Sequence, residues 1–447
     1  MVSRLVLLSK KHLDNDLLTL WLNNLLVVYA FLLPISQTIK ATIFSFMVIL
    51  FILRRDVIKH IQNALSNSVV RAFLYIFIAY AVGLLWTSHL EEGLLWVKNL
   101  KYGLYLILFY AIVDGRYIGK VISAFILGMF VSELTSYGMQ FGIMPWKLEI
   151  GKVLFYQSYA IGDPSPFLHH IHYGVALAFT VILLTYKTFF TQGSKVFKFF
   201  MSLFIMSATT NIFITGGRTG YITFFMLVTM LALFYLRKVA LQLLLVVVLA
   251  FATAYNFSSI FYEKVVQTEQ SLKDLSKDDP DFNSSLGQRA GIYYYAYKVI
   301  KEHPFFGVGT GDSMDEIRKV IPEKWESLKQ MPHEHNQFLS VLVKLGIVGL
   351  FIYLNIFYQI FKYKEQEDRD LRFIMIFVTL AIAFGTLMTQ FNLRFFLPLW
   401  AVFLAVTLVS RERRTIENIK LDDKKQFIQI VFLVIVFGSA SLLHQLM

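Results

Sequence analysis

The sequence predicts an all-α polytopic membrane protein, and three observations lead to this fold class. First, 56% of the 447 residues are hydrophobic and 16% are charged, with a mean hydropathy of +0.58, whereas soluble proteins are roughly 25% charged. Second, apolar runs of about 20 residues recur along the chain, each long enough to cross about 30 Å of hydrocarbon. Third, basic residues gather in every second loop between these runs. This composition excludes a soluble or disordered protein.

The charge and cysteine counts limit the kinds of site that this chain can form. Lys and Arg number 42 against 30 Asp and Glu, which gives a formal net charge of +12, and the chain has no cysteine. Disulfides, thiolate metal sites, iron–sulfur clusters and cysteine nucleophiles are therefore excluded. The N-terminus carries Arg4, Lys10 and Lys11 before the first long apolar run and lacks a small-residue cleavage site. We expect it to be retained rather than removed as a signal peptide.

The basic loops orient the spans, because Lys and Arg in short loops stay on the cytoplasmic side of a membrane. The N-terminus and the loops with Arg54 and Arg55, with Arg116, with Lys195 and with Arg237 are accordingly placed inside. Twelve spans result, at about 18–35, 38–54, 69–87, 94–113, 118–139, 171–190, 199–215, 220–236, 239–256, 336–361, 371–390 and 395–410. A thirteenth apolar run at about 427–445 follows a basic stretch, and hydropathy does not decide whether it spans.

This topology leaves one long polar segment, on the outer side. We divide the chain into N-terminal transmembrane helices (1–256), an outer loop domain (257–335) and C-terminal transmembrane helices (336–447). Within the loop, the acidic piece KDLSKDDPDFNSS precedes an apolar-aromatic pattern, QRAGIYYYAYKVIKEHP. We expect a helix there that starts near Ser285 or Gly287 and ends before Pro304, since the residue before proline disfavours the α region.

The first candidate site is the turn GGRTGY, Gly216 to Tyr221, where the seventh span gives way to the eighth on the outer side. Gly216 and Gly217 permit close backbone approach and leave amides free, and the planar fork of Arg218 suits phosphate oxygens. The alternative is an arginine that snorkels from a tight turn.

The second candidate is Arg289, at the start of the predicted outer helix. An anion bound there would also meet the helix N-terminus. The alternative is a solvated surface charge.

The third candidate is the polar cluster in MPHEHNQFL, which turns directly into a span. His333 and His335 are two residues apart and lack the i, i+4 spacing of a helical zinc site, so a metal site is not expected. A neutral histidine at a water–membrane boundary suits general base catalysis. A helix-capping interfacial histidine is the alternative.

Three further features are weaker. FLHHIHYG places His169, His170 and His172 just before the sixth span. One interpretation is that they contact the phosphates or sugar of a donor, and the alternative is a structural or interfacial role. HPFFGVGTGD resembles a dinucleotide loop superficially, but it follows a helix pattern and lies outside, so we reject a nucleotide site. The tyrosines of YYYAY are either packing residues or sugar platforms.

Together, these motifs resemble the bacterial O-antigen ligase family, and the resemblance covers roughly residues 200–365. It rests on the GGRTGY turn, a long loop with an arginine helix followed by HPFFGVGTGD, and HEHNQFL leading into KLGIVGL. The remaining spans match in number and hydropathy alone. The resemblance implies a glycosyltransferase C-like membrane fold in the bacterial inner membrane, with the active site facing the periplasm. The wider superfamily includes O-antigen polymerases and protein O-oligosaccharyltransferases, so the acceptor is less well defined than the chemistry.

The family's roles carry over residue by residue. Arg218 looks like the arginine after the span-joining turn, Arg289 like the periplasmic-loop arginine, and His335 like the histidine of the His-Asn pair. These three are the predicted catalytic residues. Predicted substrate contacts are Asn336, His333, which lies two places before His335 and competes with it for the role of base, His170 and Gly217.

The implied reaction is inverting transfer of an undecaprenyl-diphosphate-linked glycan to the lipid A core. Two arginines would replace the divalent metal of many nucleotide-sugar enzymes, so we expect no metal and no cofactor. Expected partners are this lipid donor, the core acceptor and membrane lipids, with no nucleic acid. The alternatives are an O-antigen polymerase and, from another class, a lipid-linked oligosaccharide flippase, which would place charge along a central cavity.

Overall fold

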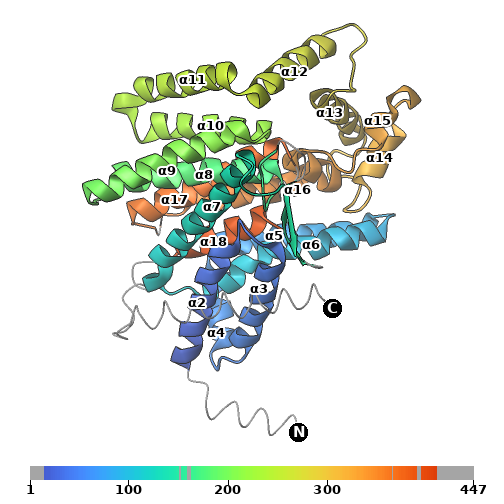
Figure 1. Ribbon diagram of the computed structural model, residues 1–447. Helices are drawn as coiled ribbons and strands as arrows, with labels where there is room; N and C mark the ends of the chain where they lie inside the picture. Colours follow the sequence, from blue (N-terminus) through green and yellow to red (C-terminus); the bar gives the residue numbers. More distant parts are fainter. Residues whose placement is uncertain (1–14, 151–152, 159–162, 365, 390–393, 410–447) are drawn as a thin grey trace.

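The computed structural model describes residues 15–150, 153–158, 163–364, 366–389 and 394–409, and these are predominantly helical (Figure 1). The helices are α2 (Asn15–Leu32), α3 (Gln37–Ile52), α4 (Val57–Ser66), α5 (Ser68–Val82), α6 (Leu90–Ile112), α7 (Ile118–Gln140), α8 (His170–Phe189), α9 (Lys195–Ile214), α10 (Arg218–Phe234), α11 (Ala240–Phe257), α12 (Ser259–Leu275), α13 (Ser285–Glu302), α14 (Ser313–Lys319), α15 (Glu326–Lys329), α16 (Gln337–Lys362), α17 (Arg369–Leu387) and α18 (Phe396–Thr407). Short 3-10 turns interrupt the connections.

A helix lies at each of the twelve predicted spans, and the prediction of a polytopic membrane protein agrees with this arrangement. Among the described residues, eight segments are long and apolar enough to cross a membrane by length and composition, and α3, α10 and α18 are shorter apolar helices. Helix α6 carries Glu91, Glu92, Lys98 and Lys101. The count of twelve crossings therefore stays a prediction. The run at 427–445 and the basic N-terminal residues lie outside the described residues.

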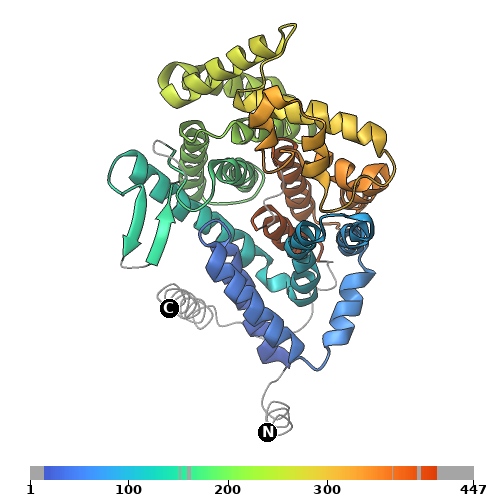
Figure 2. The same cartoon turned by 90° about the vertical axis from the view of Figure 1, so that its right-hand side faces the viewer.

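The outer segment between α7 and α8 contains the one departure from an all-helical chain within the described residues. Strands β1 (Lys147–Ile150) and β2 (Val153–Gln157) pair antiparallel as a hairpin, visible beside α7 in Figure 2. The sequence predicted a loop for this segment. Alternation in four or five residues is a weak signal, which is why the hairpin was not predicted.

The loop domain has its own apolar core. Helix α13 begins at Ser285, after the Ser284 hydroxyl accepts a hydrogen bond from the Gly287 amide at 3.0 Å. It ends at Glu302, two residues before Pro304, as predicted. Its inner face packs with α14 and α15, and Val343 of α16 joins the same cluster. The helices of the predicted outer loop therefore rest directly on α16, a candidate membrane span.

Helix α16 is broken at Gly346, and the glycine-rich loop after α13 fills the break. Gly346 has φ +63°, which a side chain would strain. On one side of the break, the amides of Val308 and Gly309 donate to the carbonyls of Val343 and Lys344, each at 3.0 Å. On the other side, the Ile347 amide donates to the Pro304 carbonyl at 2.9 Å. HPFFGVGTGD thus clamps backbone groups that a broken helix would leave unpaired.

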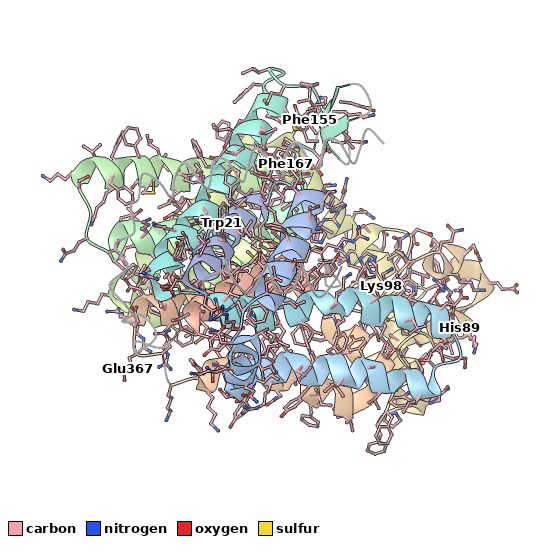
Figure 3. The ribbon with its side chains drawn as sticks, turned by 90° about the horizontal axis from the view of Figure 1, so that it is seen from below. Trp21, His89, Lys98, Phe155, Phe167 and Glu367 are labelled. Carbon is pink, nitrogen blue, oxygen red and sulfur yellow. The ribbon has the colours of Figure 1, made fainter. Side chains whose placement is uncertain are left out.

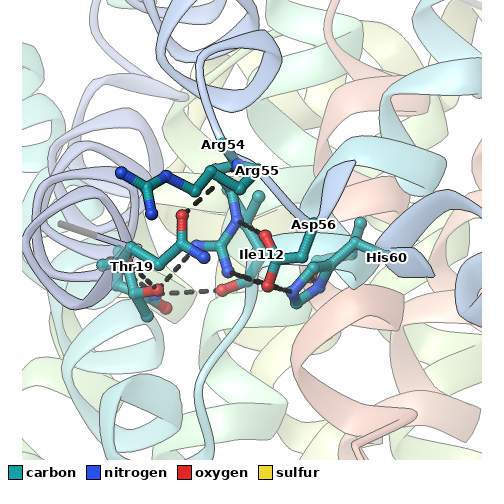
Figure 4. A network of polar contacts seen from close by, with 9 residues as sticks. Thr19, Arg54, Arg55, Asp56, His60 and Ile112 are labelled. Atoms are coloured by element: carbon teal, nitrogen blue, oxygen red, sulfur yellow. Dashed lines mark hydrogen bonds and ion pairs between the residues drawn. The ribbon is translucent and has the colours of Figure 1, made fainter. Parts of the chain in front are cut away.

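The ends predicted to lie inside meet in a polar network (Figure 4). Arg54, after α3, contacts Asp56 at 2.9 Å, the Thr19 hydroxyl at 2.6 Å and His60 at 3.0 Å. The His60 Nδ1 lies 2.8 Å from the Ala111 carbonyl near the end of α6. The predicted inner ends of α2, α3 and α6 are therefore tied together. His89 and Glu367, from loops predicted to lie outside and inside, are on opposite sides of the molecule (Figure 3).

The predicted orientation is open to a labelling test, because the chain has no native cysteine. Asp278 and Glu367 are both exposed, in an outer and an inner loop of the predicted topology. In right-side-out membrane vesicles, we expect a membrane-impermeant maleimide to label Asp278→Cys at once and Glu367→Cys only after permeabilisation. The wild-type chain is the control for background. Immediate labelling of both variants would contradict the topology.

The clamp at Gly346 makes a stability prediction. A Cβ at this position would overlap the Phe305 carbonyl, and the positive φ is unfavourable for alanine. We expect Gly346→Ala to lower the free energy of unfolding by about 2 kcal/mol or more. Gly119→Ala is the matched control: Gly119 is an exposed glycine of α7 with nothing within 4 Å of an added Cβ. This control should change stability by about 1 kcal/mol at most. Thermal unfolding in detergent measures both, and equal effects would argue against the clamp.

Candidate active site

The GGRTGY turn is held tightly against α8. Gly217 caps α10, and the Tyr221 hydroxyl donates to the Thr215 carbonyl at 2.7 Å across the turn. A Cβ on Gly217 would lie 2.9 Å from the His170 carbonyl oxygen and 3.4 Å from the His170 ring. Glycine is required here by close packing, and Arg218 is placed at the first position of α10.

A polar cavity of about 230 Å³ opens beside this turn. Its lining residues come from α8, α10, α12 and α13 and from the turn: His170, Ile171, Gly216, Arg218, Thr219, Lys264, Gln267, Ser285 and Arg289. Arg218 and Arg289, which are 71 positions apart in the sequence, thus line the same space. None of these lining residues is an acid.

Arg218 and Arg289 differ in the contacts that their guanidinium groups make. One terminal nitrogen of Arg218 donates to the Gln267 side-chain oxygen at 3.1 Å, and its Nε is buried without a partner in the described structure. Burial lowers the pKa of Arg289, although a guanidinium stays charged at neutral pH. The cavity is therefore positively charged and suits an anion with several oxygens.

His170 is oriented by a carboxylate that the sequence analysis overlooked. Its Nδ1 lies 2.6 Å from Asp163, whose other oxygen accepts a hydrogen bond from the Ser165 hydroxyl at 2.9 Å. The sequence pattern does not connect this carboxylate with the histidine cluster, and the structure brings the two together. With Nδ1 occupied, Nε2 is the ring nitrogen left to meet a ligand. His170 is the one member of the cluster that lines the cavity.

The histidine pair lies in an irregular segment before α16. The ring centroids of His333 and His335 are 4.0 Å apart. The backbone amide of His335 donates a hydrogen bond to Nδ1 of His333 at 3.3 Å. His335 has φ +53°, the one positive φ among the described non-glycine residues. Strained backbone of this kind clusters at functional sites. The Nδ1 of His335 is buried and unpartnered in the described part of the chain.

Burial, His333 and Arg289 lower the pKa of His335 to about 3. His335 is therefore neutral at physiological pH and has a lone pair available. Arg289 also acts electrostatically on His333, so the histidine pair neighbours the arginine cavity, although neither histidine lines it.

Asn336 has a structural use in this arrangement. Its side-chain oxygen accepts a hydrogen bond from the Leu339 amide at 3.1 Å and so caps α16. The Tyr293 hydroxyl donates to the neighbouring His335 carbonyl at 3.2 Å. The predicted contact between Asn336 and substrate is not tested by this geometry and stays a prediction.

A buried ion pair fixes the segment between the two histidines. Glu334 is fully buried and lies 2.9 Å from the Lys344 ammonium, which also donates to the Ser340 hydroxyl at 2.6 Å. Burial alone would raise the pKa of Glu334, but Lys344 lowers it to about 2. Glu334 is thus buried, whereas the histidines on either side of it are partly exposed.

Sequence reasoning missed Lys264, Gln267 and Asp163. Lys264 and Gln267 are three apart on α12, so they share one face of that helix, but α12 carries other charged residues that hide this pattern. Asp163 precedes His170 by seven residues, in a segment with no periodic pattern. The signal that would have identified Asp163 is a carboxylate a few residues before a histidine in the same loop.

The low pKa of His335 makes the stability of the protein depend on pH. The ordinary pKa of about 6.5 applies to the unfolded chain, so between pH 6.5 and 3 the unfolded state binds a proton that the native state does not. Stability therefore falls as the pH decreases through this range. We expect the thermal midpoint of the wild-type protein to fall more between pH 7.5 and 5.0 than that of His335→Gln. Identical pH dependence would contradict a buried neutral His335.

Comparison with known proteins shows which family part of the chain resembles. Residues 201–354 match the family model described as O-Antigen ligase. An uncharacterised protein of Haemophilus influenzae is 29% identical over 217 residues, which is 44% of this chain and about half (52%) of the relative. The family match runs from α9 into α16 and includes Arg218, Arg289 and the His333–Asn336 segment. Residues 201–354 are thus similar to the O-antigen ligase family, in a chain whose apolar helices indicate a multi-pass membrane protein.

Proposed function

We propose that the protein is an O-antigen ligase, which transfers undecaprenyl-diphosphate-linked O-polysaccharide to the lipid A core at the periplasmic face of the inner membrane. The observation that carries this proposal is the acid-free cavity lined by both Arg218 and Arg289 beside the neutral histidine pair. It offers the two groups that glycosyl transfer from a lipid diphosphate needs, namely fixed positive charge for the leaving group and a base for the acceptor.

The arginines act on the leaving group. In the proposed reaction, the bond between the anomeric carbon and the diphosphate oxygen breaks, and its electron pair moves to that oxygen. A core-sugar hydroxyl attacks from the opposite face, so the anomeric centre is inverted. Arg218 and Arg289 stabilise the charge that develops on the diphosphate, because preorganised cations in a water-poor site lower the barrier.

His335 accepts the proton of the attacking hydroxyl. A base with a pKa of about 3 is weak, but one cause of this low value is the positive charge of Arg289. A diphosphate bound at Arg289 offsets that charge and so raises the basicity of His335 when the donor is present. His333, Asn336, His170 and Gly217 are proposed to contact the substrates around this centre.

The proposal predicts the activity of three variants. In purified protein with lipid-linked glycan, rough lipopolysaccharide and EDTA, we expect Arg218→Ala to lower the transfer rate by about 10²- to 10³-fold. His335→Ala should lower it by about 10²- to 10⁴-fold. Arg237→Ala is the matched control, because Arg237 is an exposed arginine just beyond the opposite end of α10 from Arg218. It should transfer at the wild-type rate.

The products identify the function. Glycan on the lipid A core that forms in EDTA and depends on Arg218 and His335 is the expected result. Longer lipid-linked chains without lipopolysaccharide product would make the protein a polymerase instead. No transfer to either acceptor, with lipid-linked glycan crossing vesicle membranes, would favour the flippase.

A further inference from the structure

We propose that Lys264 is a third catalytic cation of the arginine cavity and that it stabilises the negative charge that appears on the lipid diphosphate during bond cleavage. This inference rests on the proposed function and assigns a role to a residue outside the motifs that led to it.

The position of Lys264 supports this role. It lies on α12 and lines the cavity with Arg218 of α10 and Arg289 of α13, so three helices each contribute one cation. A Cβ on Gly216 would lie 3.5 Å from Lys264 Cε. The lysine stem therefore lies in contact range of the turn that carries Arg218. Gln267, on the same face of α12, accepts the hydrogen bond from Arg218 and links this helix to the arginine.

Lys264 differs from the other lysines near it. Lys273 pairs with Glu269, and Lys277 pairs with Asp274, each at 2.7 Å. Lys264 forms no ion pair with any carboxylate of the described residues, and the cavity that it lines contains no acid. Like charges gathered in one small cavity repel each other, at a cost that grows as water is excluded. A bound anion with several charges removes this cost.

The charge of the donor matches this set of cations. A diphosphate linked at both ends, to sugar and to lipid, carries one negative charge on each phosphate. When the anomeric carbon–oxygen bond breaks, its electron pair stays on the phosphate oxygen, and the terminal phosphate gains a further charge, since its second pKa is near 6. The hydroxyl proton goes to His335, and the new glycosidic bond completes the balance.

Arg218 and Arg289 thus balance the two charges of the bound donor and stay beside them as the leaving group forms, and Lys264 adds the positive charge that balances the third negative charge, which appears only as the reaction proceeds. An interaction that is stronger in the transition state than in the ground state raises kcat rather than lowering KM. The proposal therefore differs from general anion attraction, which would change KM.

The test uses Lys264→Met, which keeps the length of the stem without the charge, with Lys264→Arg as the conservative variant. Lys273→Met, on the exposed surface of the same helix, is the matched control. In the transfer assay at pH 7.5, we expect Lys264→Met to lower kcat by about 10²-fold with KM nearly unchanged. Lys264→Arg should keep most of the activity, and Lys273→Met should behave as wild type. A rise in KM with unchanged kcat, or no effect, would overturn the proposal.

A binding measurement tests the same residue without turnover. Farnesyl diphosphate carries the additional charge of the leaving group, and its P²-methyl diester lacks it. We expect Lys264→Met to weaken binding of farnesyl diphosphate by about tenfold more than binding of the diester, with unchanged thermal unfolding. Equal weakening of both probes, or of neither, would argue against a role for Lys264 in matching the developing charge.

The two readouts separate this inference from the proposed function. If wild-type protein transfers no glycan, the proposed function fails, while the difference between the two probes still decides whether Lys264 recognises the additional charge. If wild type transfers glycan and Lys264→Met does so equally well, the ligase stands and the role of Lys264 falls.

Discussion

The buried ion pair between Glu334 and Lys344 is the interaction on which the arrangement of the site depends. Both side chains are almost fully buried, at 0% and 1% exposure, and removing one partner from such a pair leaves an uncompensated charge in the protein interior. The pair joins the irregular segment that carries His333 and His335 to the first half of α16. Lys344 lies two residues before the break at Gly346, where the loop after α13 supplies the missing backbone partners. The ion pair, the helix break and the loop therefore form one unit, and the histidines are held by all three.

The cavity lies where helices predicted to span the membrane meet helices of the predicted outer loop. α8 and α10 contribute His170 and Arg218, while α12 and α13 contribute Lys264 and Arg289. Neither layer alone gathers the positive charge. In the predicted topology, this location would suit the proposed lipid-linked donor, whose tail would stay at the level of the membrane while its head reaches the cations.

The sequence predicted the positions of the helices well, because a membrane imposes a length and an apolar composition that single residues rarely disguise. It also selected Arg218, at a turn between two predicted spans, and Arg289, at the start of the predicted outer helix, and both line one cavity, while their catalytic roles stay predictions. It did not predict what depends on tertiary contacts. From the sequence, we rejected the HPFFGVGTGD loop as a nucleotide site but did not predict its structural role. That role, the clamp on α16, depends on the helix break at Gly346, whose positive φ is visible only in the structure. The orientation of His170 by Asp163 has no periodic signal at all.

The clamp also has a consequence for the order in which the chain assembles. Residues 303–309 precede α16 in the sequence, so they leave the ribosome before the helix whose break they complete. The unpaired carbonyls of Val343 and Lys344 would be costly in lipid, and the amides that pair with them lie in a segment predicted to lie on the outer side. In that topology, the outer loop must cross the membrane before α16 settles in its final form. In the predicted topology, the final form of this helix therefore depends on folding of the loop domain, and the two events are coupled.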